Sequence, residues 1–311
     1  MDYFERRDGV LHADGVDLRA IAQAVGTPTY VYSAATLERH VRVMREALEP
    51  LPHLLCYAVK ANGNLAVLEL LHSFGAGFDA VSVGELARVW RAGGDLGKTI
   101  VSGVGKRNDE IAAALRAGCR YICIESAAEL DAVIAIAKRL GVQAPVTVRV
   151  NPNVDAKTHP YISTGLRENK FGVPSEEAHA LYARGNASEH VRMVGVSCHI
   201  GSQITDLEPF LDAATLVRDL AIDLKKAGAP LEHIGMGGGL GIPYQGEAPP
   251  APARYGEALR TLLGSLGLTL ILEPGRVVVG NAGILLTRTE RLKRHGSHHF
   301  AIVDAGMNDL L

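Results

Sequence analysis

Residues 121–141 read YICIESAAELDAVIAIAKRLG, an apolar run followed at once by a segment with helical periodicity. The run Tyr121–Ser126 is nearly continuous in its apolar character, which is typical of a strand buried on both faces in a parallel sheet. Ser126 and Glu129 have the spacing of a capping box at a helix N-terminus, and Gly141 suits the C-terminal cap. This stretch therefore predicts one strand–helix unit.

The same unit recurs along the chain. Each apolar run is followed by an amphipathic segment, and the runs are Leu54–Lys60, Gly77–Ser82, Thr99–Val104, Tyr121–Ser126, Pro145–Asn151, Met193–Ile200, Leu231–Gly237 and Leu268–Glu273. Strands that alternate with helices predict an α/β fold with a parallel sheet. Eight units favour a (β/α)8 TIM barrel that closes near residue 275, while an open doubly wound sheet is the alternative.

The two ends of the chain fall outside this count. Residues 1–26 predict a short strand, a turn and a short helix, and residues 276–311 have the β-branched, alternating pattern of antiparallel strands. We therefore expect a barrel domain at residues 27–275. Residues 1–26 and 276–311 would form the beginnings of a second, β-rich domain.

Composition limits the classes of partner. The net charge is −2 and the chain has no run of Lys or Arg, which argues against nucleic acid and anionic membrane surfaces. No apolar stretch reaches the roughly 18 residues of a membrane span, and the first residues lack the apolar segment of a secretory signal. Cys56, Cys119, Cys123 and Cys198 lie in or beside apolar runs, as reduced, buried thiols do. We expect a cytoplasmic protein with no metal site.

Polar residues collect at the predicted strand ends, which is where TIM barrels carry their function. Lys60 ends the first strand, and the later strands contribute Asp79, Glu125, Arg149, His199, Ser202, Gly237, Gly238, Gly239, Glu273 and Arg276. Because ionisable groups are costly to bury without a partner or ligand, their convergence at one rim predicts a functional site there.

The residue types at this rim suggest one cofactor. Three successive glycines can offer backbone N–H groups to a phosphate, and a lysine beside a phosphate cradle suggests a Schiff base with pyridoxal phosphate (PLP). We expect partial desolvation to lower the pKa of Lys60 and make its amine a better nucleophile. Glu273 suits the pyridine nitrogen, and His199 suits stacking on the ring. Each residue alone more often has an ordinary structural role, and only the ordered combination favours PLP.

The combination resembles a known family. The matching stretches keep the family's order over nearly the whole chain, and they are YAVKAN, FDAVSVGEL, RVNP, KFG, HIGSQITDLEPF, GGGLGIPY, EPGR and VDAGMNDL. They resemble the fold-type III PLP-dependent decarboxylases, and most closely the diaminopimelate decarboxylases. Ornithine and arginine decarboxylases share the lysine, the glycines and EPGR but match less well around GSQITDLEPF.

The resemblance implies roles for the residues at the rim. Lys60 would carry the cofactor, His199 would stack on its ring, and Glu273 would pair with the pyridine nitrogen. Further contacts to the cofactor would come from Asp79, Glu85, Arg149, Ser202, Gly237, Gly238, Gly239 and Arg276. Arg276 would contact either the phosphate or a carboxylate of the substrate, and the sequence leaves both open.

The implied reaction is loss of CO2 from the D-configured centre of meso-2,6-diaminopimelate, which gives L-lysine, in a homodimer with shared active sites. The alternatives are a decarboxylase of another basic amino acid (ornithine, arginine or lysine) and a non-catalytic PLP-binding barrel. A racemase of the same fold is disfavoured, because such enzymes usually place an arginine where Glu273 would lie. Family members continue beyond AGMNDL, so we expect weak PLP binding and little or no activity from these 311 residues alone.

Overall fold

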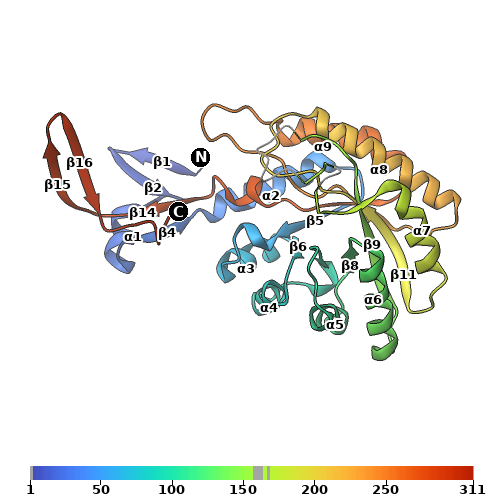
Figure 1. Ribbon diagram of the computed structural model, residues 1–311. Coiled ribbons are helices and arrows are strands. Elements are labelled where there is room, and N and C mark those ends of the chain that lie inside the picture. The colour runs from blue at the N-terminus through green and yellow to red at the C-terminus, as the bar shows by residue number, and fades with distance from the viewer. Residues whose placement is uncertain (1–2, 157–163, 167–168, 311) are drawn as a thin grey trace. The chain divides into compact units, whose positions relative to one another are not determined.

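The computed structural model describes residues 3–156, 164–166 and 169–310. Residues 53–272 contain a closed barrel of eight parallel strands with helices around its outside (Figure 1). In order around the ring the strands are β5 (His53–Ala58), β6 (Gly77–Ala80), β7 (Thr99–Val101), β8 (Tyr121–Ile124), β9 (Ala144–Asn151), β11 (Val191–Ser197), β12 (His233–Gly235) and β13 (Thr269–Leu272). Pairing of β8 with β9 and of β13 with β5 closes the ring, which confirms the predicted barrel over the open sheet.

The helices follow the strands as the sequence predicts. Those around the barrel are α3 (Leu65–Ser73), α4 (Val83–Arg91), α5 (Asn108–Arg116), α6 (Ala127–Leu140), α7 (Ser175–Asn186), α8 (Glu208–Lys226) and α9 (Pro252–Leu263). α2 (Ala34–Leu48) precedes β5, α10 (Arg276–Val279) follows β13, and β10 (Val173–Pro174) pairs with β9 outside the ring. At α6 the hydroxyl of Ser126 accepts from the N–H of Glu129, and Gly141 caps the C-terminus in the left-handed region, as predicted.

Several strands end earlier than the apolar runs do. β5 ends at Ala58, so Lys60 lies in the 3-10 turn η1 (Val59–Ala61) and not in the strand itself. Likewise β6 ends at Ala80, and Ser82 is the N-cap of α4. The apolar pattern continues past these strands because Val59 is still buried and Val81 is half-buried, even though the hydrogen-bonded ladder has stopped. Two further 3-10 turns are η2 (Leu96–Lys98) and η4 (Gly264–Leu266).

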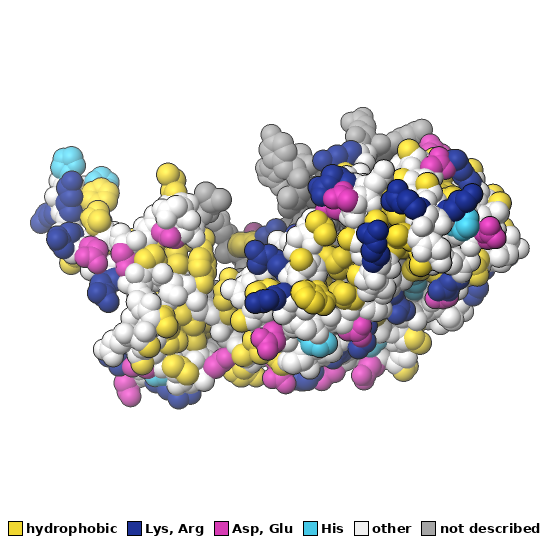
Figure 2. Space-filling view, turned by 90° about the horizontal axis from the view of Figure 1, so that it is seen from below, with side chains coloured by type: hydrophobic (Ala, Val, Ile, Leu, Met, Phe, Trp, Pro, Cys, Tyr) yellow, Lys and Arg dark blue, Asp and Glu magenta, His cyan; other side chains and the backbone are white. Residues whose placement is uncertain are grey.

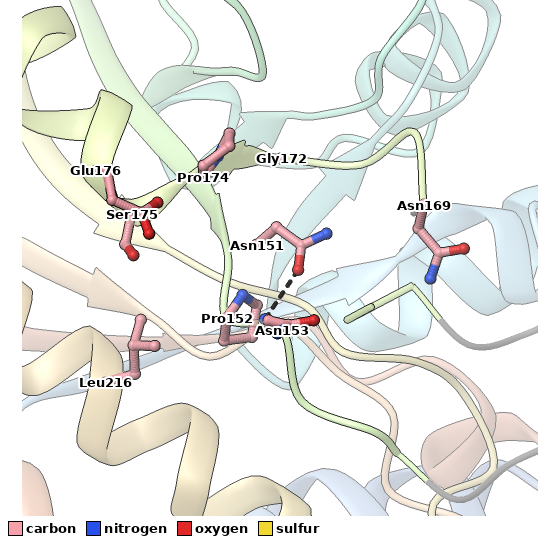
Figure 3. A pocket seen from close by; sticks show the side chains of 9 residues that line it. All are labelled: Asn151, Pro152, Asn153, Asn169, Gly172, Pro174, Ser175, Glu176 and Leu216. Carbon is pink, nitrogen blue, oxygen red and sulfur yellow. Dashed lines mark hydrogen bonds between the residues drawn. The ribbon is translucent and has the colours of Figure 1, made fainter. Parts of the chain in front are cut away.

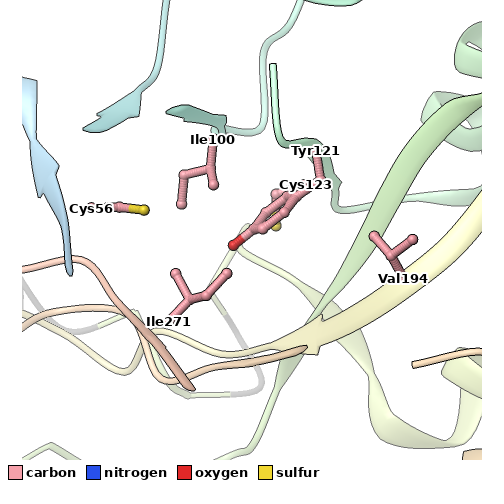
Figure 4. Packing of buried hydrophobic residues seen from close by; sticks show 6 residues of the cluster. All are labelled: Cys56, Ile100, Tyr121, Cys123, Val194 and Ile271. Carbon is pink, nitrogen blue, oxygen red and sulfur yellow. The ribbon is translucent and has the colours of Figure 1, made fainter. Parts of the chain in front are cut away.

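The interior of the barrel is filled by side chains. Figure 4 shows residues from five strands pointing toward one another, namely Cys56, Ile100, Tyr121, Cys123, Val194 and Ile271. The ring of His233 on β12 stacks on Tyr121 with 4.4 Å between the ring centroids. Gly195 makes room for it, since a Cβ there would stand 2.1 Å from His233 Nε2. The barrel is therefore a packed core, and its ends are left for chemistry.

A second compact unit is formed by both ends of the chain, the residues up to Arg39 and Val279–Leu311, while His40–Val278 form the barrel unit. Its elements are β1 (Phe4–Arg7), β2 (Val10–Ala13), β3 (Val16–Asp17), α1 (Leu18–Val25), β4 (Thr29–Tyr32), β14 (Gly283–Leu286), β15 (Thr289–His295) and β16 (His298–Val303). β14 pairs with β4, and β15 pairs with β16, both antiparallel. The predicted β-rich character of the chain ends is confirmed. The boundaries at residues 27 and 275 stay a prediction.

Two surface properties bear on partners. Among the described helices, none is both long and apolar enough to cross a membrane. Figure 2 shows basic and acidic side chains mixed over the face in view, in keeping with a net charge of −2 for the whole sequence.

Candidate active site

The predicted site residues meet at the C-terminal rim of the barrel. Lys60 follows β5, Asp79 lies in β6, and Arg149 lies in β9. His199 and Ser202 follow β11, Gly237, Gly238 and Gly239 follow β12, and Glu273 and Arg276 follow β13. Because the strands are parallel, their carboxyl ends share one rim, and hydrogen bonds or charge interactions link these residues around it.

Lys60 forms an ion pair with a buried carboxylate. Its Nζ donates to Asp79 Oδ2 at 2.9 Å, and Asp79 is fully buried while the lysine side chain is 53% exposed. The pairing of β5 with β6 places Ala58 beside Asp79, which brings the carboxylate within reach of η1. Attraction by Asp79 raises the pKa of Lys60 and outweighs the desolvation that lowers it. The expected lowering of this pKa is therefore wrong, because the ion pair with Asp79 has the larger effect.

His199 presents a neutral imidazole to the rim. The backbone N–H of Gly238 donates to His199 Nδ1 at 3.2 Å, so the neutral ring carries its proton on Nε2. Desolvation lowers the pKa of His199 well below its ordinary value, and the positive charges of Arg149 and Lys60 act in the same direction. An uncharged, flat ring is suited to stacking on another aromatic ring.

The glycine turn after β12 has no room for side chains. Gly237 and Gly239 have positive φ angles of 63° and 107°. A Cβ on Gly238 would stand 2.2 Å from the carbonyl oxygen of Glu273, and one on Gly239 would stand 2.4 Å from that of Gly201. Only glycine fits here, so Gly238 and Gly239, both partly exposed, present bare backbone to the rim.

Glu273 is tied to the same turn. Its backbone N–H donates to Gly237 O at 2.7 Å. Burial raises the pKa of the Glu273 carboxyl, and the negative charge of Asp79 raises it further, while Lys60 and Arg149 act against this. A carboxyl group held in this way gains from a cationic partner.

Arg149 is held by three neighbours. Its Nη1 donates to Glu125 Oε1 at 3.2 Å, its Nη2 donates to His199 O at 3.3 Å, and its guanidinium lies 4.9 Å from the centre of the Phe171 ring. Glu125 Oε2 also accepts from the N–H of Gly172 at 2.8 Å. Glu125, which the sequence places at a strand end but outside the predicted cofactor contacts, thus connects Arg149 to the KFG segment.

Arg276 keeps one donor without a partner. Its Nη1 donates to the hydroxyl of Tyr244 and its Nη2 approaches Ser202 Oγ at 3.4 Å. Its Nε is buried and has no hydrogen-bond partner among the described residues. An unpaired guanidinium N–H beside a hydroxyl is a ready donor for an anion. Tyr244 was missed by the sequence reasoning, and its only signal was its place at the end of GGGLGIPY.

A separate cavity of about 290 Å³ lies next to this rim (Figure 3). It is lined by Asn151, Pro152, Asn153, Asn169, Gly172, Pro174, Ser175, Glu176 and Leu216, and none of the predicted site residues lines it. Asn151 Oδ1 accepts from the N–H of Asn153 at 2.9 Å, and its Nδ2 donates to Phe171 O at 3.1 Å. The side chain of Asn151 thus ties the KFG segment to the end of β9.

Comparison with known proteins identifies the family. Residues 34–280 match the pyridoxal-dependent decarboxylases in the part described as the pyridoxal binding domain. The diaminopimelate decarboxylase of Pseudomonas aeruginosa is 53% identical over 311 residues, which cover 100% of this chain and 75% of that protein. The chain belongs to the diaminopimelate decarboxylase family.

Further members of the decarboxylase family agree in sequence and fold. The diaminopimelate decarboxylase of Vibrio cholerae is 49% identical over 313 residues, again with 100% of this chain and 75% of the relative covered. The crystal structure of the Helicobacter pylori enzyme complexed with L-lysine has a TM-score of 0.90 and 40% identity, with 94% of this chain and 74% of that chain covered. The chain thus spans about three quarters of the length of these relatives.

The rim fits the cofactor of this decarboxylase family. It offers the amine of Lys60, a glycine turn without room for side chains, and an unpaired buried N–H of Arg276 for a phosphate. It also offers the Glu273 carboxyl group for a ring nitrogen and the neutral ring of His199 for stacking. In the described part of the chain, no group of His, Cys, Asp and Glu is arranged to hold a metal ion.

Proposed function

We propose that this chain catalyses the PLP-dependent decarboxylation of meso-2,6-diaminopimelate to L-lysine and CO2. The observation that carries the proposal is 53% identity, over the full chain, to the diaminopimelate decarboxylase of Pseudomonas aeruginosa. When bound, PLP supplies the electron sink that accepts the electrons of the broken C–CO2 bond. The residues of the chain bind the reactants, orient them and set their charges.

Lys60 is the residue to which we assign covalent attachment of PLP. The residue lies in η1, just beyond β5, and its side chain is half exposed, which leaves it open to an incoming aldehyde. The bond to Asp79 Oδ2 keeps the amine in place and holds it in its charged form. The amine must lose a proton before it attacks, so the strength of this ion pair controls its readiness to react.

Glu273 is assigned to the nitrogen of the cofactor ring, and His199 is assigned to one face of the ring. The raised pKa of Glu273 leaves its carboxyl prone to hold a proton, and a ring nitrogen that shares this proton would satisfy both groups. The neutral His199 ring would cover one ring face without adding a charge. Arg149 holds the backbone at His199 through the His199 carbonyl.

Arg276 and Ser202, with Gly237, Gly238 and Gly239, are assigned to the phosphate. The unpaired Nε of Arg276 and the bare backbone of the glycine turn support this assignment. A substrate carboxylate on Arg276 is the alternative.

The setting of the reaction is also part of the proposal. We propose residues 27–275 as the PLP-binding domain and a homodimer with shared active sites, both supported by the family resemblance. All four cysteines are free and buried, which supports a reducing compartment, and we therefore propose the cytoplasm.

A CO2-release assay tests the proposed reaction. Meso-diaminopimelate, lysine, ornithine and arginine are supplied in parallel with PLP, to this chain and to a form extended at its C-terminus to the length of the relatives. We expect the extended form to release CO2 from meso-diaminopimelate alone, with L-lysine as the product. Faster release from ornithine, arginine or lysine would favour another decarboxylase, and PLP binding by the extended form without any release would favour a non-catalytic barrel.

A further inference from the structure

The carboxylate that holds Lys60 has a second partner. Asp79 Oδ2 accepts from Lys60 Nζ at 2.9 Å, and Asp79 Oδ1 accepts from the hydroxyl of Ser102 at 2.5 Å. Ser102 is only 8% exposed, so this second bond lies away from solvent. Ser102 is not among the residues that the sequence or the family resemblance placed at the site.

The main chain fixes the position of Ser102. β6 and β7 are paired so that Asp79 faces Ile100 and Ala80 faces Val101. One step beyond, the N–H of Ser102 donates to Ala80 O at 3.0 Å and continues the ladder. Gly103 then turns the chain away with a φ of 102°. The Ser102 hydroxyl is therefore held beside Asp79 by the sheet itself.

Both carboxylate oxygens of Asp79 are satisfied only while Ser102 donates. A buried carboxylate oxygen without a donor is costly, and a carboxylate with one bond can rotate about its Cβ–Cγ bond. With two bonds on opposite oxygens, rotation would break both. We infer that Ser102 is a positioning residue, which fixes the carboxylate plane of Asp79 so that Oδ2 faces Lys60 Nζ and the ion pair keeps its full strength.

Other charged groups around Lys60 limit how far the loss of Ser102 can change the pKa of Lys60. Glu273, after β13, and Glu85, on α4, also raise the pKa of Lys60, but less than Asp79 does, and desolvation opposes all three. His199, after β11, is neutral. Loss of Ser102 would weaken the strongest of these attractions and leave the rest. The expected effect is therefore smaller than that of Asp79→Asn.

Trace acetylation of Lys60 tests the inference without PLP. Acetic anhydride reacts only with the neutral amine, so the yield of acetylated Lys60 peptide across a pH series reports its titration, with the exposed Lys138 as internal reference. We expect Ser102→Ala to increase acetylation of Lys60 at fixed pH by about three-fold or more, because the weaker ion pair lowers the pKa of Lys60. Ser102→Thr keeps the hydroxyl and should restore the wild-type profile.

Matched variants distinguish a positioning role of Ser102 from a general effect of removing a buried hydroxyl. Ser197→Ala removes another buried serine hydroxyl, which contacts Cys123 Sγ, and should leave Lys60 unchanged. Ser102→Cys keeps the shape with a weaker donor and carries the test if Ser102→Ala does not fold; we expect an intermediate increase. A wild-type acetylation profile in the folded Ser102→Ala or Ser102→Cys variant would overturn the inference.

The inference rests on the role proposed for Lys60, but the two can fail separately. A lack of CO2 release would count against the proposed function and leave the acetylation result as it is. Unchanged acetylation would remove the role of Ser102 and leave the proposed reaction untouched.

Discussion

The pKa of Lys60 is raised because the attraction of Asp79, with smaller contributions from Glu273 and Glu85, outweighs its desolvation. The sequence predicts Lys60 as the last residue of the first barrel strand, whereas β5 ends at Ala58 and Lys60 lies in η1. The sequence does not indicate which carboxylate the amine meets, since that depends on the register of β5 against β6. Desolvation can be expected from an apolar context alone, whereas an ion pair requires knowledge of which residues face each other.

Glu273→Gln should stabilise the PLP-free chain increasingly as the pH rises. Burial and then Asp79 raise the pKa of Glu273 in the folded chain, so ionisation of this group costs free energy only in the folded state. The cost is absent below the ordinary value of 4.5, where both states are protonated, and grows as the pH rises toward the raised value. Urea unfolding should show nearly equal stability at about pH 4 and a gain of about 1 kcal/mol or more for Glu273→Gln at about pH 8.

A pH-independent difference between the two proteins would contradict this expectation, since a packing effect alone would not vary with pH. Glu110→Gln offers a matched control. The pKa of Glu110 is lowered by backbone hydrogen bonds from Arg107 and Val83, so its replacement should destabilise the chain more at the higher pH.

At the scale of elements, the sequence predicts the regular parts well and the turns poorly. The caps of α6 follow from Ser126 and Gly141, because a cap is decided by residues within one turn. The ends of β5 and β6 cannot be predicted in this way, because Val59 and Val81 extend the apolar pattern beyond the last hydrogen bond of the sheet. The contact of Arg276 with Tyr244 joins residues 32 positions apart, and no local pattern reports it.

Gly238→Ala should distort the glycine turn and lower both PLP affinity and stability. The new Cβ would stand 2.2 Å from Glu273 O, so the turn and Glu273 must move apart. We expect PLP affinity, measured by absorbance titration, to fall about tenfold or more, with a loss of about 1–3 kcal/mol in unfolding free energy. Gly264→Ala, where a Cβ meets nothing within 4 Å, is the control and should leave both values near wild type. Wild-type PLP affinity in Gly238→Ala would exclude this turn from the cofactor site.

At the scale of the whole barrel, closure of the ring is what brings distant residues to one rim. Eight strand–helix units were enough to predict the barrel, because that count matches a closed ring and the strands are buried on both faces. The network that links Lys60, Asp79 and Ser102 was not predictable, since it needs the register of three adjacent strands. Sequence patterns thus indicated which residues share the rim, and the structure shows which of them touch.

A second lysine that follows a barrel strand differs from Lys60 in its exposure to solvent. Lys106 follows β7, but its side chain is only 2% exposed, and its Nζ pairs with Glu129 Oε1 at 2.8 Å and donates to Cys123 O at 2.6 Å. An amine enclosed in this way is closed to a reactant. Of these two lysines, Lys60 is therefore the one with a solvent-exposed side chain.

The most direct test of this account is to map the lysine that carries PLP. The chain is loaded with PLP, reduced with borohydride, digested and analysed by mass spectrometry, alongside Lys60→Ala and Lys106→Ala variants. We expect a pyridoxyl group on Lys60, retained in any Lys106→Ala protein that folds and lost in Lys60→Ala. A pyridoxyl group on Lys106 or Lys170 in the wild-type chain, or a reducible PLP that persists in Lys60→Ala, would contradict it.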